Sequence, residues 1–184
     1  MDAAAALRPC PIDVTLAGEV YTVTALPAAD WLMAIIGEPG AVLPGLLSEE
    51  DQRRVYHRIL RGHLEPAEIN RAWRALLAAA TGRTWWSASR LCMSAADPEA
   101  WPSVHGRLLT SGIDLDVVSI GALCNAIYFM IMSSSEDDAE RSRHQFELEL
   151  VPAGHETDLA ELVADDETNA ENFMAAITQL QQFG

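Results

Sequence analysis

The sequence predicts a mainly α-helical protein, a helical bundle with a short N-terminal β-hairpin and an acidic C-terminal tail. Three observations lead to this class. Apolar residues alternate with period two only near the N-terminus, they recur at helical spacing through most of the remaining chain, and acidic residues concentrate towards the C-terminus. The 184 residues divide into a flexible N-terminus (1–11), a hairpin (12–26), a helical body (27–151), and an acidic mobile tail with a candidate terminal helix (152–184).

The hairpin is predicted from alternating and β-branched residues. Ile12, Val14 and Leu16 point to one side of a first strand, and residues 20–24 form a second strand after a Gly-containing turn at residues 17–18. Because two strands alone are only marginally stable, the hairpin must pack on the rest of the protein.

Proline, glycine and capping residues set the first helix boundaries. Pro27 opens a helix that ends at Gly37, and residues 38–45, with two prolines and two glycines, predict a loop. Ser48 caps the next helix, which ends at Gly62. The apolar face of that helix comprises Val55, Ile59 and Leu60.

The remaining body is predicted to be helical throughout. Helices are expected from Pro66 to a stop at Gly82, over residues 84–95, over 99–110 after an Asp97-Pro98 cap, from Asp114 or Asp116 to Met132, and over 136–150. The apolar run at residues 117–132 is sixteen residues long. Since a membrane span needs about 20 apolar residues, we expect a buried helix and no membrane partner.

The charge of the chain is strongly asymmetric. Residues 111–184 hold fifteen acids and two arginines, so they carry −13 of the total charge of −15. Such a surface repels nucleic-acid phosphates and anionic membranes, which argues against both as partners. The charge therefore favours a protein that works by holding other proteins.

No residue cluster predicts catalysis, a cofactor or a metal. The five histidines lack metal-ligand spacing, there is no GxSxG motif, and the three cysteines are far apart without a CxxC pair. Cys92 and Cys124 lie in apolar helical stretches and are expected to be small core residues. We therefore predict that the protein is not an enzyme.

Two regions are candidates for partner binding. Trp85 and Trp86 are adjacent, and neighbours on a helix lie about 100° apart, so one of them is a candidate exposed anchor unless the helix is covered on both sides. The second region is the terminal segment, residues 169–183, which could fold on a partner. Its candidate residues are Phe173, Ile177 and Leu180. Whether the chain forms a homo-oligomer is left open.

The segment of residues 12–32, IDVTLAGEVYTVTALPAADWL, resembles the start of tail assembly chaperones of long-tailed phages that infect actinobacteria. In that family, too, a short hairpin leads into a helix start of the type Pro-Ala-x-x-Trp-Leu. The VLPGLL stretch at residues 42–47, the double tryptophan, the helical body and the acidic C-terminal region are also similar.

The resemblance implies a non-enzymatic role in the host cell cytoplasm. Members of the family coat the long, apolar tape measure protein, keep it soluble and help to recruit tail tube subunits. They are usually made in two forms by a programmed ribosomal frameshift, the longer with an extra C-terminal domain. Two alternatives to an assembly chaperone stay open: a virion structural component, such as a tail terminator or head–tail connector, and a small helical enzyme without a recognisable motif.

Overall fold

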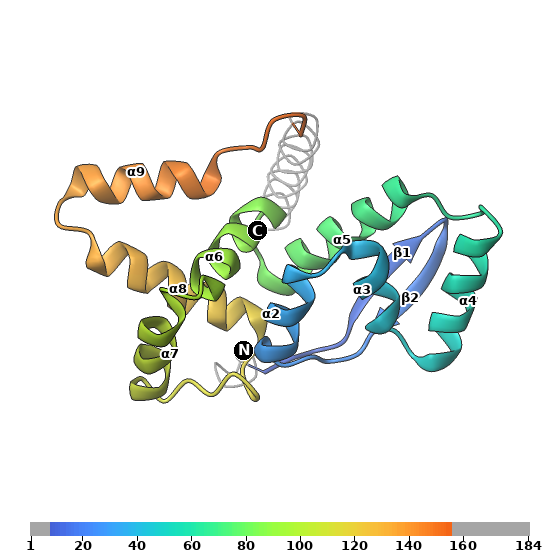
Figure 1. Cartoon of the computed structure of the whole chain (residues 1–184), viewed down its shortest axis with the longest axis horizontal. Coiled ribbons are helices and arrows are strands. Elements are labelled where there is room, and N and C mark those ends of the chain that lie inside the picture. The colour runs from blue at the N-terminus through green and yellow to red at the C-terminus, as the bar shows by residue number, and fades with distance from the viewer. Residues whose placement is uncertain (1–7, 156–184) are drawn as a thin grey trace, which may run out of the picture. The chain divides into compact units, whose positions relative to one another are not determined.

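The computed structural model describes residues 8–155, in which eight helices follow a two-stranded hairpin (Figure 1). The mainly helical class with an N-terminal β-hairpin is therefore confirmed. Contacts divide the chain into two compact units, Met1–Glu149 and Leu150–Gly184, and every helix and strand described below belongs to the first. The predicted flexible N-terminus and acidic tail lie largely outside the described residues.

The hairpin consists of β1 (Ile12–Leu16) and β2 (Glu19–Val23), paired in antiparallel register. Leu16 pairs with Glu19 across a two-residue turn, in which Ala17 and Gly18 have φ values of 47° and 80°. Positive φ at both positions gives the turn type whose twist matches that of the strands. Alternate side chains of both strands are buried on one face, so the hairpin packs on the helical body as predicted.

Helix α2 (Ala28–Ile36) begins after Pro27 and ends at Gly37, as the sequence predicts. The predicted loop at residues 38–45 is wrong, because this stretch forms the short helix α3 (Pro39–Gly45). Proline at the first helical position costs no hydrogen bond, and the amides of Ala41 and Val42 donate to the Glu38 carbonyl at 2.9 and 3.0 Å. The buried side chain of Leu43 fixes α3 against the body.

Helices α4 (Glu49–Leu60) and α5 (Pro66–Thr81) end at the predicted signals. The Ser48 hydroxyl accepts a hydrogen bond from the Asp51 amide at 3.2 Å, and Gly82 ends α5 in the left-handed conformation with a φ of 65°. The predicted apolar face of α4 is only partly correct. Val55 is buried, but Leu60 is 86% exposed, because its position faces away from the body.

The last helices are α6 (Trp85–Ala96), α7 (Trp101–Thr110), α8 (Ile120–Ser134) and α9 (Asp138–Glu149). The side chain of Asp97 accepts bonds from the amides of residues 99 and 100, in a turn that precedes α7, so this helix begins two residues later than predicted.

The predicted start of α8 at Asp114 or Asp116 is also wrong, since Ser119 is its cap and accepts a hydrogen bond from the Ala122 amide at 3.2 Å. The segment before α8 instead supplies hydrogen-bond acceptors to the N-terminus of α2. The carbonyls of Leu115 and Val118 accept hydrogen bonds from the first amides of α2 at 3.1 and 2.9 Å. The N-terminus of α2 is thus capped by residues far along the chain.

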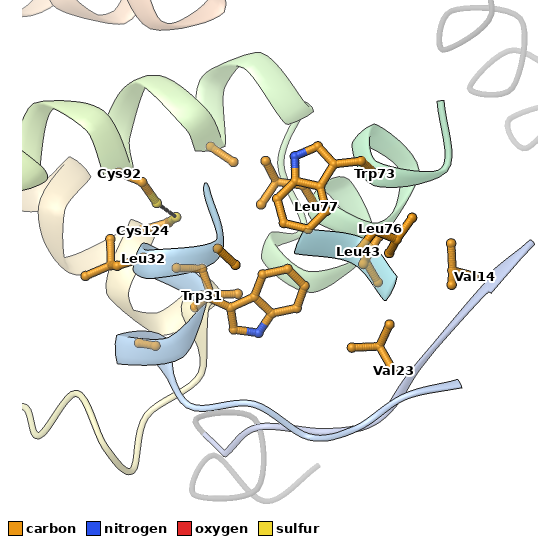
Figure 2. Packing of buried hydrophobic residues seen from close by; sticks show 14 of the residues in the cluster. Val14, Val23, Trp31, Leu32, Leu43, Trp73, Leu76, Leu77, Cys92 and Cys124 are labelled. Carbon is orange, nitrogen blue, oxygen red and sulfur yellow. Dashed lines mark hydrogen bonds between the residues drawn. The ribbon is translucent and has the colours of Figure 1, made fainter. Parts of the chain in front are cut away.

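The core is built from α2, α3, α5, α6 and α8 together with the buried face of the hairpin, which packs on α5. Figure 2 shows Trp31 of α2 facing Trp73 of α5, with ring centroids 6.0 Å apart. On α8, Leu123 and Ile127 are buried, whereas Phe129 is 70% exposed. The prediction of a buried helix therefore holds for one face of α8 only.

Candidate interaction surface

Helix α9 is held mainly at its C-terminal end. Arg90 of α6 donates from one guanidinium nitrogen to the carbonyls of Glu147 and Leu148 at 2.8 and 3.1 Å. The indole Nε1 of Trp86 donates to the Glu149 carbonyl at 3.3 Å. The last carbonyls of a helix have no partner within it, so α6 supplies these partners from outside.

The other side of α9 forms an exposed surface. Ala139, Arg143, Phe146 and Glu147 lie at positions i, i+4, i+7 and i+8, and all four are exposed. We call this set the α9 surface. Phe146 is 65% exposed on this otherwise polar helix.

The α9 surface lies on a strongly acidic helix. Residues 136–149 contain six acids and two arginines, a net charge of −4. Both arginines pair with acids of the same helix, Arg141 with Asp138 at 3.2 Å and Arg143 with Glu140 at 3.6 Å. The α9 surface itself holds one arginine and one acid, Arg143 and Glu147, 4.0 Å apart, and the excess negative charge lies on the rest of the helix. An exposed apolar ring on an acidic helix suits a partner helix that carries apolar and basic side chains.

The structure separates the two tryptophans. Trp86 is buried, so the expectation that it could be an exposed anchor is wrong, because α9 covers it. Trp85 is half-buried and contacts the Trp86 ring edge to face at 5.7 Å. The guanidinium of Arg74 lies 5.0 Å from the centre of the Trp85 ring. Trp85 therefore remains the partly accessible member of the pair.

The other predicted partner-binding residues, Phe173, Ile177 and Leu180, lie outside the described residues. The contacts that hold α9 and the exposed ring of Phe146 were not among the predicted site features. The sequence pattern that could have indicated Phe146 is a single phenylalanine within a strongly charged helical segment.

Cys92 of α6 and Cys124 of α8 are both buried, as predicted, and we call them the buried thiol pair (Figure 2). Their sulfur atoms lie 3.8 Å apart. This contact, together with burial, raises the pKa of the Cys92 thiol, whereas the hydrogen bond from Cys92 lowers the pKa of the Cys124 thiol. Within residues 8–155, no group of three or more His, Cys, Asp or Glu side chains could hold a metal ion.

A polar cluster joins the hairpin to α4. Arg58 pairs with Glu19 at 2.8 Å, and the Tyr21 hydroxyl donates to Glu19 at 2.7 Å. The hydrogen bond from Tyr21 and the nearby Arg58 charge lower the pKa of Glu19, while burial and the Glu19 carboxylate raise the pKa of Tyr21. The cluster consists of two residues of β2 and one arginine of α4, and its charge-assisted hydrogen bonds stabilise the packing of the hairpin on α4.

Comparisons with protein-family profiles, with curated proteins and with solved structures found no match for this chain. None of the helices within residues 8–155 is long and apolar enough to cross a membrane.

Proposed function

We propose that the protein is a non-enzymatic tail assembly chaperone of a long-tailed phage. In this role it binds the tape measure protein in the host cytoplasm, keeps it soluble and helps to recruit tail tube subunits. The proposal rests on the resemblance of residues 12–32, a segment in which the hairpin leads directly into α2.

The observation that favours this function over the alternatives is the exposed Phe146 on an acidic helix. A chaperone for apolar helices needs accessible apolar side chains to bind its client. It also needs charge around them to keep the loaded complex soluble. The α9 surface offers both on one helix, and the firm attachment of its C-terminal end keeps it in place while a client binds.

The proposal is tested by co-expression with a fragment of the tape measure protein. We expect the fragment to stay in the soluble fraction and to co-purify with the full-length chain. Phe146→Ser should weaken the complex about tenfold, as truncation of a central aromatic contact does. Leu60→Ser, which removes an even more exposed apolar residue from α4, should leave the complex intact.

Two results would count against the proposal. An insoluble fragment with no co-purifying complex would remove its basis. Abundant peptides of this chain in purified phage particles, measured by mass spectrometry, would favour a virion structural component instead.

A further inference from the structure

Strand β1 has one unpaired edge. Within residues 8–155 the sheet contains only β1 and β2. Because Leu16 and Glu19 close a two-residue turn, they form a hydrogen-bonded pair, and such pairs alternate along the strands. The backbone groups of Asp13 and Thr15 in β1 therefore point away from β2, and none of the described residues hydrogen-bonds to them.

This edge lacks proline, lysine and a bulge, three features that commonly protect a strand from further pairing. The sequence of β1 is IDVTL, and its register with β2 is regular over all five residues. The edge is thus competent to pair with another extended chain.

The edge opens into a groove of about 550 Å³ between β1 and α5. The strand side is lined by residues 13–15 together with Ala17 and Gly18 of the turn. The helix side presents three alanines, Ala72, Ala75 and Ala79, together with Leu76, Glu68 and Arg71. The short alanine side chains leave space beside the strand for a second backbone.

Only an extended backbone can satisfy the outward N–H and C=O groups of a strand edge, so a helix does not fit this groove. A second copy of this chain does not fit well either. Helix α5 packs along β1 rather than β2 (Figure 1). Pairing β1 with β1 of another copy would therefore bring the α5 helices of both copies close to the two-fold axis between them. The geometry therefore favours a single extended segment.

The charges of the groove define the segment further. Its lining contains the carboxylates of Asp13 and Glu68 and one arginine, Arg71. Asp13 already accepts a hydrogen bond from the Thr22 hydroxyl at 2.7 Å, but a carboxylate has further acceptor positions. The net charge beside the strand edge is negative.

We propose that the groove between β1 and α5 binds an extended segment of a partner protein as a third strand. The segment carries small side chains towards α5 and a basic side chain beside Asp13. This site is separate from the α9 surface, so its failure and that of the proposed chaperone function are distinguishable.

The test uses the full-length, isotope-labelled protein and a synthetic probe, the acetylated and amidated hexapeptide Ala-Arg-Val-Arg-Ala-Thr. Main-chain hydrogen bonds supply most of the affinity in strand addition, so a generic alternating peptide is an adequate probe. We expect a Kd below about 1 mM, together with shifts of the Asp13 and Thr15 amide signals and slower hydrogen exchange at both. The control peptide has the same side chains but N-methyl groups on alternate amides, and it should bind at least about tenfold more weakly.

A pair of variants tests the edge directly. Thr15→Pro removes an outward N–H from the free edge of β1, and Val20→Pro removes one from the opposite edge of the hairpin. Binding should be lost in the first and kept in the second.

Three results would overturn the proposal: unchanged Asp13 and Thr15 amide signals at 2 mM peptide (about twice the highest expected Kd), equal binding of the methylated peptide, or equal loss in both variants. If Thr15→Pro fails to fold, the comparison of the two peptides decides alone.

Discussion

The attachment of α9 to α6 predicts a specific effect of replacing Arg90 by methionine. Methionine keeps the apolar stem of the side chain but removes the donors that reach the carbonyls of Glu147 and Leu148. These two carbonyls then lose their partner from α6, while the hydrogen bond from Trp86 to the Glu149 carbonyl and the core of the body are left unchanged.

The size of the effect follows from these two hydrogen bonds, at 2.8 and 3.1 Å. Hydrogen bonds to a charged group contribute about 1.5–3 kcal/mol each when shielded, but Arg90 is partly exposed, and water replaces much of what is lost. We expect α9 to become easier to detach by about 1–2 kcal/mol, which corresponds to roughly 5–30-fold faster local opening.

Hydrogen exchange measures this opening directly. Amides of α9 should exchange roughly 5–30-fold faster in Arg90→Met, while those of α5 keep their rates. The matched control is Arg53→Met, which removes an arginine paired at 3.1 Å with Glu49 on the exposed side of α4, where both side chains are more than three quarters accessible. Such a pair contributes about 0–0.5 kcal/mol. Unchanged exchange of α9 in Arg90→Met would show that the two hydrogen bonds from Arg90 do not hold the helix.

Other parts of the molecule give three further tests. A Cβ at Gly121 would lie 3.2 Å from the Ala80 carbonyl, so Gly121→Ala should lower the free energy of unfolding by about 1–3 kcal/mol in urea titrations. Gly106 has open space around it, so Gly106→Ala should raise the free energy of unfolding by about 0.5–1 kcal/mol. Stabilisation by both substitutions would contradict the close helix contact at Gly121. The pKa of Glu19 is lowered from 4.5 by the Tyr21 hydrogen bond, so its stabilising effect is present above about pH 4.5 and is lost as the pH falls through the lower folded-state pKa. Glu19→Gln should flatten this part of the stability curve measured by thermal unfolding, and an unchanged curve would refute the assignment. Alkylation followed by mass spectrometry should modify the exposed thiol of Cys10 in the native protein and the buried thiol pair only on unfolding.

The parts of the fold that depend on local signals could be predicted from the sequence. Ser48 and Gly82 each act through hydrogen bonds or backbone conformation within a few residues, and they begin and end helices as expected. The failure at α3 has a different origin. Proline and glycine locally favour a turn, but the buried side chain of Leu43 stabilises a helix through contacts that sequence patterns do not reveal.

The candidate site could be predicted only in part for the same reason. The adjacent tryptophans were predicted as candidate anchors, but which of the two rings is buried depends on α9. Glu149 of this helix lies 63 residues from Trp86 along the chain. The start of α8 likewise depends on carbonyls that cap α2. Hydrogen bonds between distant segments leave no periodic pattern, so local sequence reasoning cannot assign them.

The acidic character of α9 affects binding differently from the apolar character of Phe146. With the two arginines paired inside the helix, the excess carboxylates attract a basic client over a distance that salt controls. Burial of Phe146 against a client does not weaken with salt. In 1 M salt the Debye length is about 3 Å, so the attraction between the carboxylates and a basic client is screened. If charge and apolar burial both contribute as proposed, the association rate of the complex falls while its dissociation rate stays nearly constant. A complex that falls apart in 1 M salt would mean that charge pairs hold the client, and that Phe146 contributes little.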